Sequence, residues 1–465
     1  MTSRIFTLQD QQAFAALSGD HNPLHVDVLA ARRTLFGRPV VHGIHLLLWA
    51  LSVALPGPAR LARLRVGFQS PVGVGEQVAL TVARPADDRL DIQLDGLAGR
   101  AVTVKAELLP FIADEGVADA VPGMGTCTQW SPGAPDQGEC RGGVRLALDR
   151  REAALLLPGL TDRLPAGQIA LLLASTYIIG MECPGLDSIY AALDLRFDAP
   201  AGPVALDWRL EQFEERFAQV ELAVGGYGAM GTLTAFIRPQ PQGQPASGTL
   251  RPHVAPGAYA GRRALVIGGG RGIGEVGAKM LGLGGADVRI TWHRGREDAA
   301  RVVADIRSSG GTADSFHLDV LSPAEGLAGT VGDGWFPTHI YYFATPPIFV
   351  AGKARFNEAI AASFMDVYVH GLSRTHQALR AINAKAPLHL HYPSSVAVDE
   401  LPLSMGEYAV AKTAGEALCR FLAKADRFLS VRIDRLPRLP TDQTANLQDI
   451  PTADMVETLS AILAA

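Results

Sequence analysis

Apolar and polar positions follow one rhythm through the first half of the chain. Two long apolar runs, at residues 42–55 and 166–180, are each followed by segments in which apolar and polar residues alternate, as at 90–95 and 219–224. Long apolar runs favour buried helices, and alternation is typical of strands with one buried face. The pattern predicts two copies of one unit, each with a helix packed into a curled antiparallel sheet.

The two copies also resemble each other in sequence. The segment PGPARLARLRVGFQSPVG (56–73) is echoed by PGLDSIYAALDLRFDAPAG (184–202), and Phe68 and Pro71 match Phe197 and Pro200 at the same spacing. We expect the two sheets to pack side by side.

From about residue 259 the rhythm changes. Short apolar segments now alternate with helical stretches, beginning with RALVIGG (263–269) and GADVRITWH (285–293). This pattern predicts a doubly wound parallel sheet. Two stretches rich in Gly and Pro, 114–142 and 238–257, separate the parts, and we expect the second to be a semi-extended tether.

Composition narrows the class of protein. The chain has 465 residues, 48% of them hydrophobic, which suits about two to four domains. Its net charge of −5 provides no general field for nucleic acid or an anionic membrane. The N-terminus has no apolar targeting segment, and the longest apolar run, 46–55, is too short to span a membrane. The cysteines lack metal-ligand spacing, so we expect a cytoplasmic protein with unpaired thiols and no metal site.

One loop combines an acid with an imidazole. Asp20 and His25 lie in FAALSGDHNPLH (14–25), where glycine and proline indicate a turn. Thr7 and Asp10 form a cap-like pair at the start of a preceding helix. The loop is expected to hold Asp20 and His25 near each other.

The longer segment FAALSGDHNPLHVDVLAA (14–31), with VVHGIHLL (40–47) after it, resembles the MaoC-like, (R)-specific enoyl-thioester hydratase/dehydratase family of hot-dog folds. The resemblance implies that Asp20 and His25 flank a water, or the leaving hydroxyl, at C3 of a 3-hydroxyacyl thioester. One group would take the C2 proton while the other delivers a proton to the departing oxygen. Gly43, which opens the next helix, is the candidate donor to the thioester oxygen, and His42 either caps that helix or joins the chemistry. The second copy lacks this segment, so we expect a non-catalytic half that shapes the acyl tunnel.

A second set of candidates follows the change of rhythm. The first strand runs into GGGRGIG (268–274), where glycines let the backbone approach a pyrophosphate at a helix N-terminus. Ser395 precedes Tyr408 by thirteen residues, and Lys412 lies one helical turn after Tyr408. Ketone reduction creates an alkoxide that needs a proton donor. A tyrosine made more acidic by a lysine ammonium, with a serine holding the carbonyl, meets that need.

This part resembles the short-chain dehydrogenase/reductase family, in particular its 3-oxoacyl-thioester reductases. The resemblance rests on SSVAVDELPLSMGEYAVAK (394–412), LDV (318–320) and VRIDRLPRLPTDQT (431–444). It implies that Ser395, Tyr408 and Lys412 are catalytic. The cofactor contacts that it implies are Gly268, Arg271, Gly272, Ile273, Gly274, Asp319, Val320, Ala344 and Thr441.

The sequence departs from that family's pattern at several positions. Ile267 replaces the usual threonine before the first glycine, and Tyr368 stands where an asparagine often completes the proton relay. Residues 342–345 read Tyr-Phe-Ala-Thr instead of Asn-Asn-Ala-Gly, and 436–437 read Leu-Pro instead of Pro-Gly. We therefore expect activity with an altered water relay. The chain ends where the family usually adds a seventh strand, which puts the usual tetramer in doubt and leaves a homodimer as a candidate.

The end of the second strand of this part, RITWHRGRE (289–297), indicates the cofactor. His293, Arg294 and Arg296 follow the strand, where a carboxylate would bind the ribose hydroxyls of NAD. Together with Arg271 in the glycine loop, these arginines suit a 2′-phosphate. We expect NADP(H).

The sequence thus predicts a multidomain enzyme, an α+β double hot-dog followed by an α/β doubly wound, Rossmann-type domain. The expected boundaries are 1–113 for a catalytic hot-dog, 143–237 for a degenerate second one, 238–257 for a linker and 258–465 for the reductase domain. We expect a 3-oxoacyl-thioester reductase joined to an (R)-3-hydroxyacyl-thioester dehydratase, acting on CoA or acyl-carrier-protein thioesters in fatty-acid or polyketide-type chain processing. Two alternatives stay open: the oxidative sequence, enoyl-CoA hydration and then oxidation of the (3R)-alcohol, and a reductase whose hot-dog part only docks an acyl carrier protein.

Overall fold

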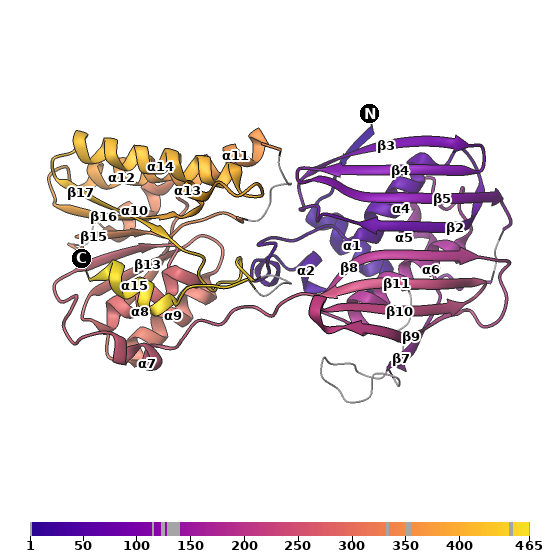
Figure 1. The fold of residues 1–465 in the computed structure, drawn as a ribbon, viewed down its shortest axis with the longest axis horizontal. Helices are drawn as coiled ribbons and strands as arrows, with labels where there is room; N and C mark the ends of the chain where they lie inside the picture. The colour runs from indigo at the N-terminus through magenta and orange to yellow at the C-terminus, as the bar shows by residue number, and fades with distance from the viewer. Residues whose placement is uncertain are drawn as a thin grey trace. The chain divides into compact units, whose positions relative to one another are not determined.

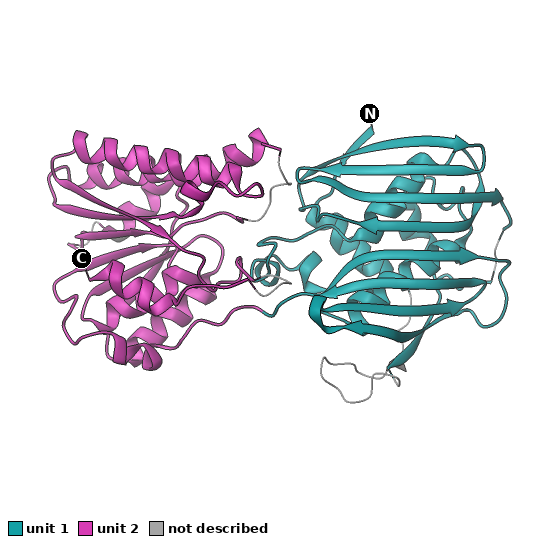
Figure 2. Cartoon of the chain, in the orientation of Figure 1, with its two compact units in different colours: residues 1–240, 446–449 teal, residues 241–445, 450–465 magenta. Residues whose placement is uncertain are grey.

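The computed structural model describes residues 2–113, 116–121, 126–127, 140–331, 334–348, 355–445 and 450–464. The chain divides into two compact units (Figure 2). Unit 1 comprises residues 1–240 and 446–449, and unit 2 comprises residues 241–445 and 450–465. Among the described residues, no helix combines the length and the apolar character that crossing a membrane requires.

The described strands of unit 1 form one sheet of 11 strands in the order β1-β3-β4-β5-β2-β8-β11-β10-β9-β7-β6 (Figure 1). Its strands in chain order are β1 Thr2–Ile5, β2 Ala59–Phe68, β3 Gln77–Ala86, β4 Arg89–Gly96, β5 Gly99–Pro110, β6 Thr126–Cys127, β7 Arg141–Arg145, β8 Ser188–Phe197, β9 Ala205–Glu214, β10 Gln219–Gly226 and β11 Ala229–Ile237. Every neighbouring pair is antiparallel, as the alternation of apolar and polar residues predicts.

The two repeats meet in the middle of this sheet. β2 and β8, which carry the echoed segments, pair with Leu64 opposite Leu195 and Val66 opposite Leu193. The two sheets are therefore continuous, whereas the sequence predicted only that they pack side by side. The pairing satisfies backbone donors and acceptors that two separate edge strands would leave open.

One long helix from each repeat packs on the same side of this sheet (Figure 1). These helices are α4 Gly43–Ala54 and α6 Ala166–Tyr177, and α6 continues into a π-helical turn, η2 Ile178–Glu182. The shorter helices of the unit are α1 Leu8–Ser18, α2 Pro23–Val26, α3 Val28–Ala31 and α5 Arg150–Leu156. Leu47 of α4, Leu172 of α6 and Leu64 of β2 are fully buried in one core, so each repeat has the expected helix packed against its sheet.

The expected linkers differ from the structure in part. Residues 114–115, 122–125 and 128–139 of the first linker lie outside the described residues. In the second, residues 247–250 form helix α7 Ser247–Leu250 and residues 251–253 a 3-10 turn, so 238–257 is not a tether throughout. Leu250 and Val254 belong to the core of unit 2, because burying these apolar side chains is favourable.

The described strands of unit 2 form a sheet of 6 strands in the order β14-β13-β12-β15-β16-β17. They are β12 Arg263–Ile267, β13 Asp287–Trp292, β14 Thr312–His317, β15 His339–Tyr342, β16 Leu388–Ser395 and β17 Leu429–Leu436, and all pairs are parallel. The doubly wound fold is confirmed. The strand order reverses between β12 and β15, and such a switch point is where these folds bind ligands.

Helices cover both faces of this sheet (Figure 1). The core on one face includes residues of α8 Gly272–Leu283, α9 Arg296–Ser308 and α15 Met455–Leu463. The core on the other face includes residues of α10 Pro323–Val331, α12 Leu372–Ile382 and α14 Gly406–Ala425. Helices α11 Glu358–Met365 and α13 Ala397–Glu400 and a π-helical turn, η5 Asp366–Gly371, complete the unit.

Candidate active sites

The loop that carries Asp20 is held at both ends. The predicted cap at the start of α1 is confirmed: the Thr7 hydroxyl accepts from the Asp10 amide at 3.1 Å, and the Asp10 carboxylate accepts from the Thr7 amide at 2.6 Å. At the end of α1, Gly19 takes the left-handed conformation with φ 76°, which reverses the chain. The Asn22 side chain then accepts from the Leu24 amide and caps α2, which contains His25.

The Asp20 carboxylate is buried, with 2% of the residue exposed. Its Oδ1 accepts from the Asn22 amide at 3.2 Å, and its Oδ2 accepts from the Thr176 hydroxyl at 2.7 Å. Burial raises the pKa of Asp20 to about 6, against the effect of these two hydrogen bonds. Asp20 can therefore gain or lose a proton near neutral pH.

His25 lies beside Asp20 with a defined tautomer. Its Nδ1 is 2.8 Å from the Val40 carbonyl oxygen, which can only accept, so Nδ1 carries the proton. Burial lowers the pKa of His25 to about 4, which leaves the imidazole neutral at pH 7 with Nε2 as a base. Side-chain atoms of Asp20, His25 and His42 lie within 4.8 Å of one another, so the structure brings the predicted pair together.

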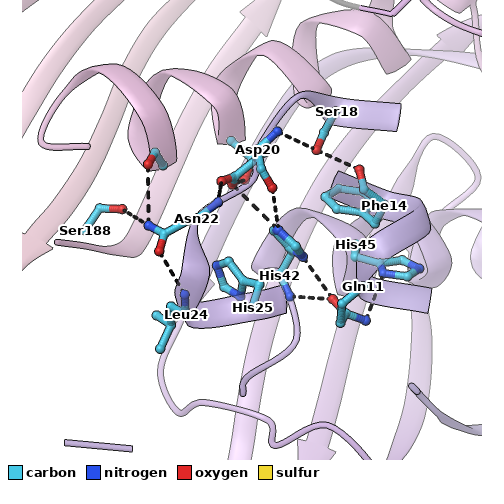
Figure 3. Close-up of polar contacts among 12 residues, drawn as sticks. Gln11, Phe14, Ser18, Asp20, Asn22, Leu24, His25, His42, His45 and Ser188 are labelled. Carbon is cyan, nitrogen blue, oxygen red and sulfur yellow. Dashed lines mark hydrogen bonds and ion pairs between the residues drawn. The ribbon is translucent and has the colours of Figure 1, made fainter. Parts of the chain in front are cut away.

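His42 belongs to this cluster (Figure 3). It is the N-cap residue of α4, as predicted, but its imidazole makes no cap hydrogen bond. Its ring stacks on His25 with centroids 3.8 Å apart, and its Nε2 lies 3.1 Å from the Asp20 carbonyl oxygen. Its Nδ1 lies 3.0 Å from Gln11 Oε1, and Gln11 Nε2 lies 3.3 Å from Nδ1 of His45. Although these side chains are of types that bind metals, both ring nitrogens of His42 face protein oxygens.

Gly43 occupies the first position of α4. The first amides of a helix have no acceptor within the helix and lie at the positive end of its dipole. An added Cβ at Gly43 would lie 2.8 Å from the ring of Phe68, so a larger residue here would require that ring to move. Its role as donor to a thioester oxygen stays a prediction.

Three residues around Asp20 come from the second repeat and were missed by the sequence reasoning. They are Thr176 in α6, Gly180 in η2 and Ser188 in β8. Asn22 Nδ2 donates to the Gly180 carbonyl oxygen at 3.4 Å and to Ser188 Oγ at 3.5 Å (Figure 3). In the sequence, Thr176 and Gly180 are two of several polar or small residues within the run 166–180, so no local signal singles them out.

In unit 2, the glycine loop joins β12 to α8, as predicted. Gly268 has φ 82°, and an added Cβ there would lie 3.0 Å from the Ala344 amide nitrogen. An added Cβ at Gly274 would lie 2.3 Å from the Gly268 carbonyl oxygen. Ile273 lies in the first turn of α8, between Gly272 and Gly274. Glycines here therefore permit close packing of the helix, the loop and the end of β15.

The other predicted cofactor residues follow the carboxyl ends of the parallel strands. His293 and Arg294 are exposed after β13, and Asp319 and Val320 follow β14. The Asp319 carboxylate accepts from the Leu321 amide at 2.9 Å. Thr441 lies after β17, with its Cγ2 3.4 Å from where a Cβ on Gly272 would be.

Arg271 has a partner that the sequence reasoning missed. Its guanidinium donates to the Asp442 carboxylate at 2.7 Å, and 20% of its side chain is exposed. The pair joins the glycine loop to the segment that contains Thr441. The proposed contact between Arg271 and a phosphate would compete with this ion pair.

The predicted catalytic residues of unit 2 come together at the end of β16. Ser395 is the last residue of β16 and Tyr408 lies in the first turn of α14, with the Ser395 side chain near enough to the Tyr408 hydroxyl to lower its pKa. Lys412 lies on α14 and donates to the Pro393 carbonyl oxygen at 2.7 Å.

The electrostatics of this group differ from the expectation. Burial raises the pKa of Tyr408 to about 12, although the bond to Ser395 opposes this, and burial lowers the pKa of Lys412 to about 7. The ammonium nitrogen of Lys412 lies 5.8 Å from the ring centroid of Tyr408. The expected acidification of the phenol is therefore not a property of these side chains by themselves, because desolvation of the buried phenol outweighs the effect of Ser395.

Tyr368 lies beside these residues in the π-helical turn η5. Its hydroxyl is hydrogen-bonded to the Thr345 hydroxyl at 2.5 Å, and its ring centroid is 5.7 Å from that of Tyr408. Burial raises the pKa of Tyr368 well above its usual value. A bulky neutral phenol therefore lies at the position where an asparagine often completes the proton relay.

Comparison with known proteins finds relatives for two parts of the chain. Residues 2–106 match the family model of the MaoC like domain. The (R)-specific enoyl-CoA hydratase of Aeromonas caviae is 40% identical over 84 residues, which are 17% of this chain and 63% of that protein. The chain therefore spans less than two thirds of that relative.

Two relatives match the other part of the chain. The cyclic-di-GMP-binding biofilm dispersal mediator protein of Escherichia coli is 26% identical over 223 residues, 44% of this chain and 84% of that protein. The short chain dehydrogenase/reductase nsrJ of Aspergillus novofumigatus is 43% identical over 70 residues, 15% of this chain and 26% of that protein. The comparisons therefore support a fusion: residues 2–106 match the MaoC like domain, and another part of the chain is similar to short-chain dehydrogenase/reductases. Among solved structures, a short chain dehydrogenase from Burkholderia cenocepacia in complex with NADP is 26% identical over 44% of this chain and 90% of that one, with a TM-score of 0.38.

The dehydrogenase/reductase domain has a site that fits a dinucleotide. Gly268 and Gly274 let the loop between β12 and α8 pack closely where any Cβ would clash, and the N-terminus of α8 that follows this loop suits a pyrophosphate. Arg294 is exposed at the carboxyl end of β13 and makes no hydrogen bond to another described residue. In unit 1, buried Asp20 and part-buried His25 lie close enough to act together as an acid and a base.

Proposed function

We propose that unit 2 reduces a 3-oxoacyl thioester with NADPH and that unit 1 removes water from the resulting (R)-3-hydroxyacyl thioester. The observation that carries the proposal is the presence, in one chain, of a buried Asp20–His25 pair and a Ser395–Tyr408–Lys412 group. The (R)-3-hydroxyacyl thioester that the Ser395–Tyr408–Lys412 group would produce is the substrate proposed for the Asp20–His25 pair. The proposed substrates are thioesters of CoA or acyl carrier protein, and the proposed setting is fatty-acid or polyketide-type chain processing.

The chemistry of unit 1 follows from the protonation of the pair. Neutral His25 accepts a proton at Nε2, and Asp20 exchanges a proton near pH 6. In dehydration, one group removes the proton at C2 and the other protonates the hydroxyl leaving C3, so that water and a trans-2-enoyl thioester form. The amide of Gly43 is the proposed donor to the thioester oxygen while negative charge develops there.

In unit 2 the protein must position the ketone and protonate its oxygen. When bound, the nicotinamide cofactor supplies the hydride. The hydroxyls of Ser395 and Tyr408 would both donate to the carbonyl oxygen, and Tyr408 would release its proton as that oxygen becomes an alkoxide. NADPH is the proposed cofactor because exposed Arg294, after β13, suits a 2′-phosphate and this strand end carries no carboxylate in residues 289–296. The NADP named for the Burkholderia cenocepacia structure is consistent with this proposal.

One assay tests both halves. Acetoacetyl-CoA and acetoacetyl-carrier protein are each incubated with the full chain and NADPH or NADH, and the acyl products are identified by mass. We expect the 3-hydroxyacyl and trans-2-enoyl products with NADPH. Accumulation of the 3-hydroxyacyl product, with no hydration of crotonyl-CoA, would reduce unit 1 to a docking module. Faster oxidation of (3R)-hydroxybutyryl-CoA with NAD⁺ would favour the oxidative direction.

A further inference from the structure

The Asp20 carboxylate is held by the repeat that lacks the catalytic segment. Thr176, on the central helix α6 of the second repeat, donates its hydroxyl proton to Asp20 Oδ2 at 2.7 Å. Both residues are buried, with 4% of Thr176 and 2% of Asp20 exposed. The Asn22 amide makes the other hydrogen bond to this carboxylate, so the hydroxyl is one of two donors that replace its lost hydration.

The same repeat also provides the space that the carboxylate occupies. An added Cβ on Gly180 would lie 2.2 Å from Asp20 Oδ1 and 2.7 Å from Oδ2. Gly180 lies in η2, the π-helical turn that extends α6, and its carbonyl oxygen accepts from Asn22 Nδ2. Single π-helical turns in helices are frequent at functional sites. Glycine at 180 is thus required by the position of Asp20.

We propose that the second repeat is part of the hydratase/dehydratase site, with Thr176 as a positioning residue that orients the Asp20 carboxylate and stabilises its ionised form. Gly180 leaves the room that this orientation needs. The inference rests on the proposed function of unit 1. The second repeat lacks the Gly-Asp-x-Asn-Pro segment, but in this proposal it still positions the catalytic carboxylate.

The groups around the Asp20 carboxylate show why the Thr176 hydroxyl matters for its pKa. Among the described residues, the side chains that approach the carboxylate from α2 and from the start of α4 are the imidazoles of His25 and His42, with His42 Nε2 4.0 Å from Asp20 Oδ2. The exposed neighbour in the loop is His21. From α6 and η2 the carboxylate meets the neutral Thr176 and Gly180. Burial raises the pKa of Asp20 and the hydrogen bond from Thr176 lowers it, so removing the hydroxyl raises that pKa further.

The test compares Thr176→Val with Thr176→Ser in the full chain. Valine keeps the shape of threonine and removes the donor, whereas serine keeps the donor. For hydration of crotonyl-CoA we expect kcat/KM to fall about tenfold to a hundredfold in Thr176→Val, because a hydrogen bond to a charged group is lost. The limb of the pH profile that Asp20 controls should move to higher pH. Thr176→Ser should restore most of the rate and the original profile.

A second pair of variants keeps the test decisive if Thr176→Val does not fold. Gly180→Ala should lower the hydration rate by displacing the carboxylate, whereas Gly57→Ala, where an added Cβ meets no atom within 4 Å, should not. NADPH-dependent ketone reduction serves as the internal control for all variants. The inference is overturned if folded Thr176→Val keeps full hydration activity and an unchanged pH profile. If Thr176→Val does not fold, the same result in Gly180→Ala overturns it. Hydration that survives Asp20→Asn instead overturns the proposed function of unit 1.

Discussion

The ammonium nitrogen of Lys412 lies 3.9 Å from the ring centroid of Tyr368, nearer than the 5.8 Å that separates it from the ring centroid of Tyr408. A cation over an aromatic face is stabilised by the ring quadrupole. The lysine charge that the proposed reaction needs beside Tyr408 is therefore drawn toward Tyr368. Mutation of Tyr368 and mutation of Tyr408 should therefore have different effects on ketone reduction.

Tyr408→Phe should reduce NADPH-dependent turnover of 3-oxoacyl thioesters to background, by about a hundredfold or more, because the alkoxide loses its proton donor. Tyr368→Asn should leave turnover at least as fast, since an amide in that place frees the lysine and has room for a water. Initial rates with acetoacetyl-CoA measure both. Near-normal turnover in Tyr408→Phe would contradict the assignment of the Ser395–Tyr408–Lys412 group, and unit 1 would then be the enzymatic part.

Asp20→Asn and His25→Ala should each abolish hydration of crotonyl thioesters, because either change removes one partner of the proton exchange. Ketone reduction should persist, since its residues lie in unit 2. Both activities are measured on the same preparation, and folding is checked by circular dichroism. Loss of both activities in well-folded Asp20→Asn would be incompatible with two independent sites.

Asp20→Asn should also stabilise the protein at neutral pH. A carboxyl whose pKa is raised by burial, here to about 6, is disfavoured in its ionised form. The penalty grows as pH rises from the unfolded pKa to the folded one and amounts to about 3 kcal/mol above it. Asparagine carries no charge, so its advantage in the melting temperature of unit 1 should be largest above pH 7 and shrink toward pH 4. An advantage independent of pH would show that Asp20 is not desolvated in the folded protein.

Arg294→Asp should shift cofactor preference from NADPH toward NADH. The introduced carboxylate repels a 2′-phosphate and accepts hydrogen bonds from ribose hydroxyls. The readout is the ratio of kcat/KM for the two cofactors. Lys385→Asp, which makes the same charge change at an exposed position between α12 and β16, serves as the control. An unchanged ratio in Arg294→Asp would remove Arg294 from the cofactor site.

Much of the architecture could be read from local patterns. Alternation at 90–95 and 219–224 predicted strands that form β4 and β10, and the spacing of Thr7 and Asp10 predicted the cap of α1. In unit 2, the segments expected as strands are β12 to β17, and the glycine loop begins α8. These features depend on neighbours within a few residues, because hydrophobic period, capping and backbone conformation are local properties.

The sequence alone predicted which residues carry the chemistry and which local segments hold them: Asp20 and His25 close together after α1, and Ser395, Tyr408 and Lys412 around one strand and helix. Only the tertiary structure decided that β2 and β8 join the repeats into one sheet, that Thr176 and Gly180 hold Asp20, and that Arg271 pairs with Asp442. It also decided that burial raises the pKa of Tyr408. These contacts join residues that are far apart in the chain, or depend on how completely water is excluded. Long-range contacts and the exclusion of water produce no periodic pattern in the sequence, because both arise when separate elements pack against one another.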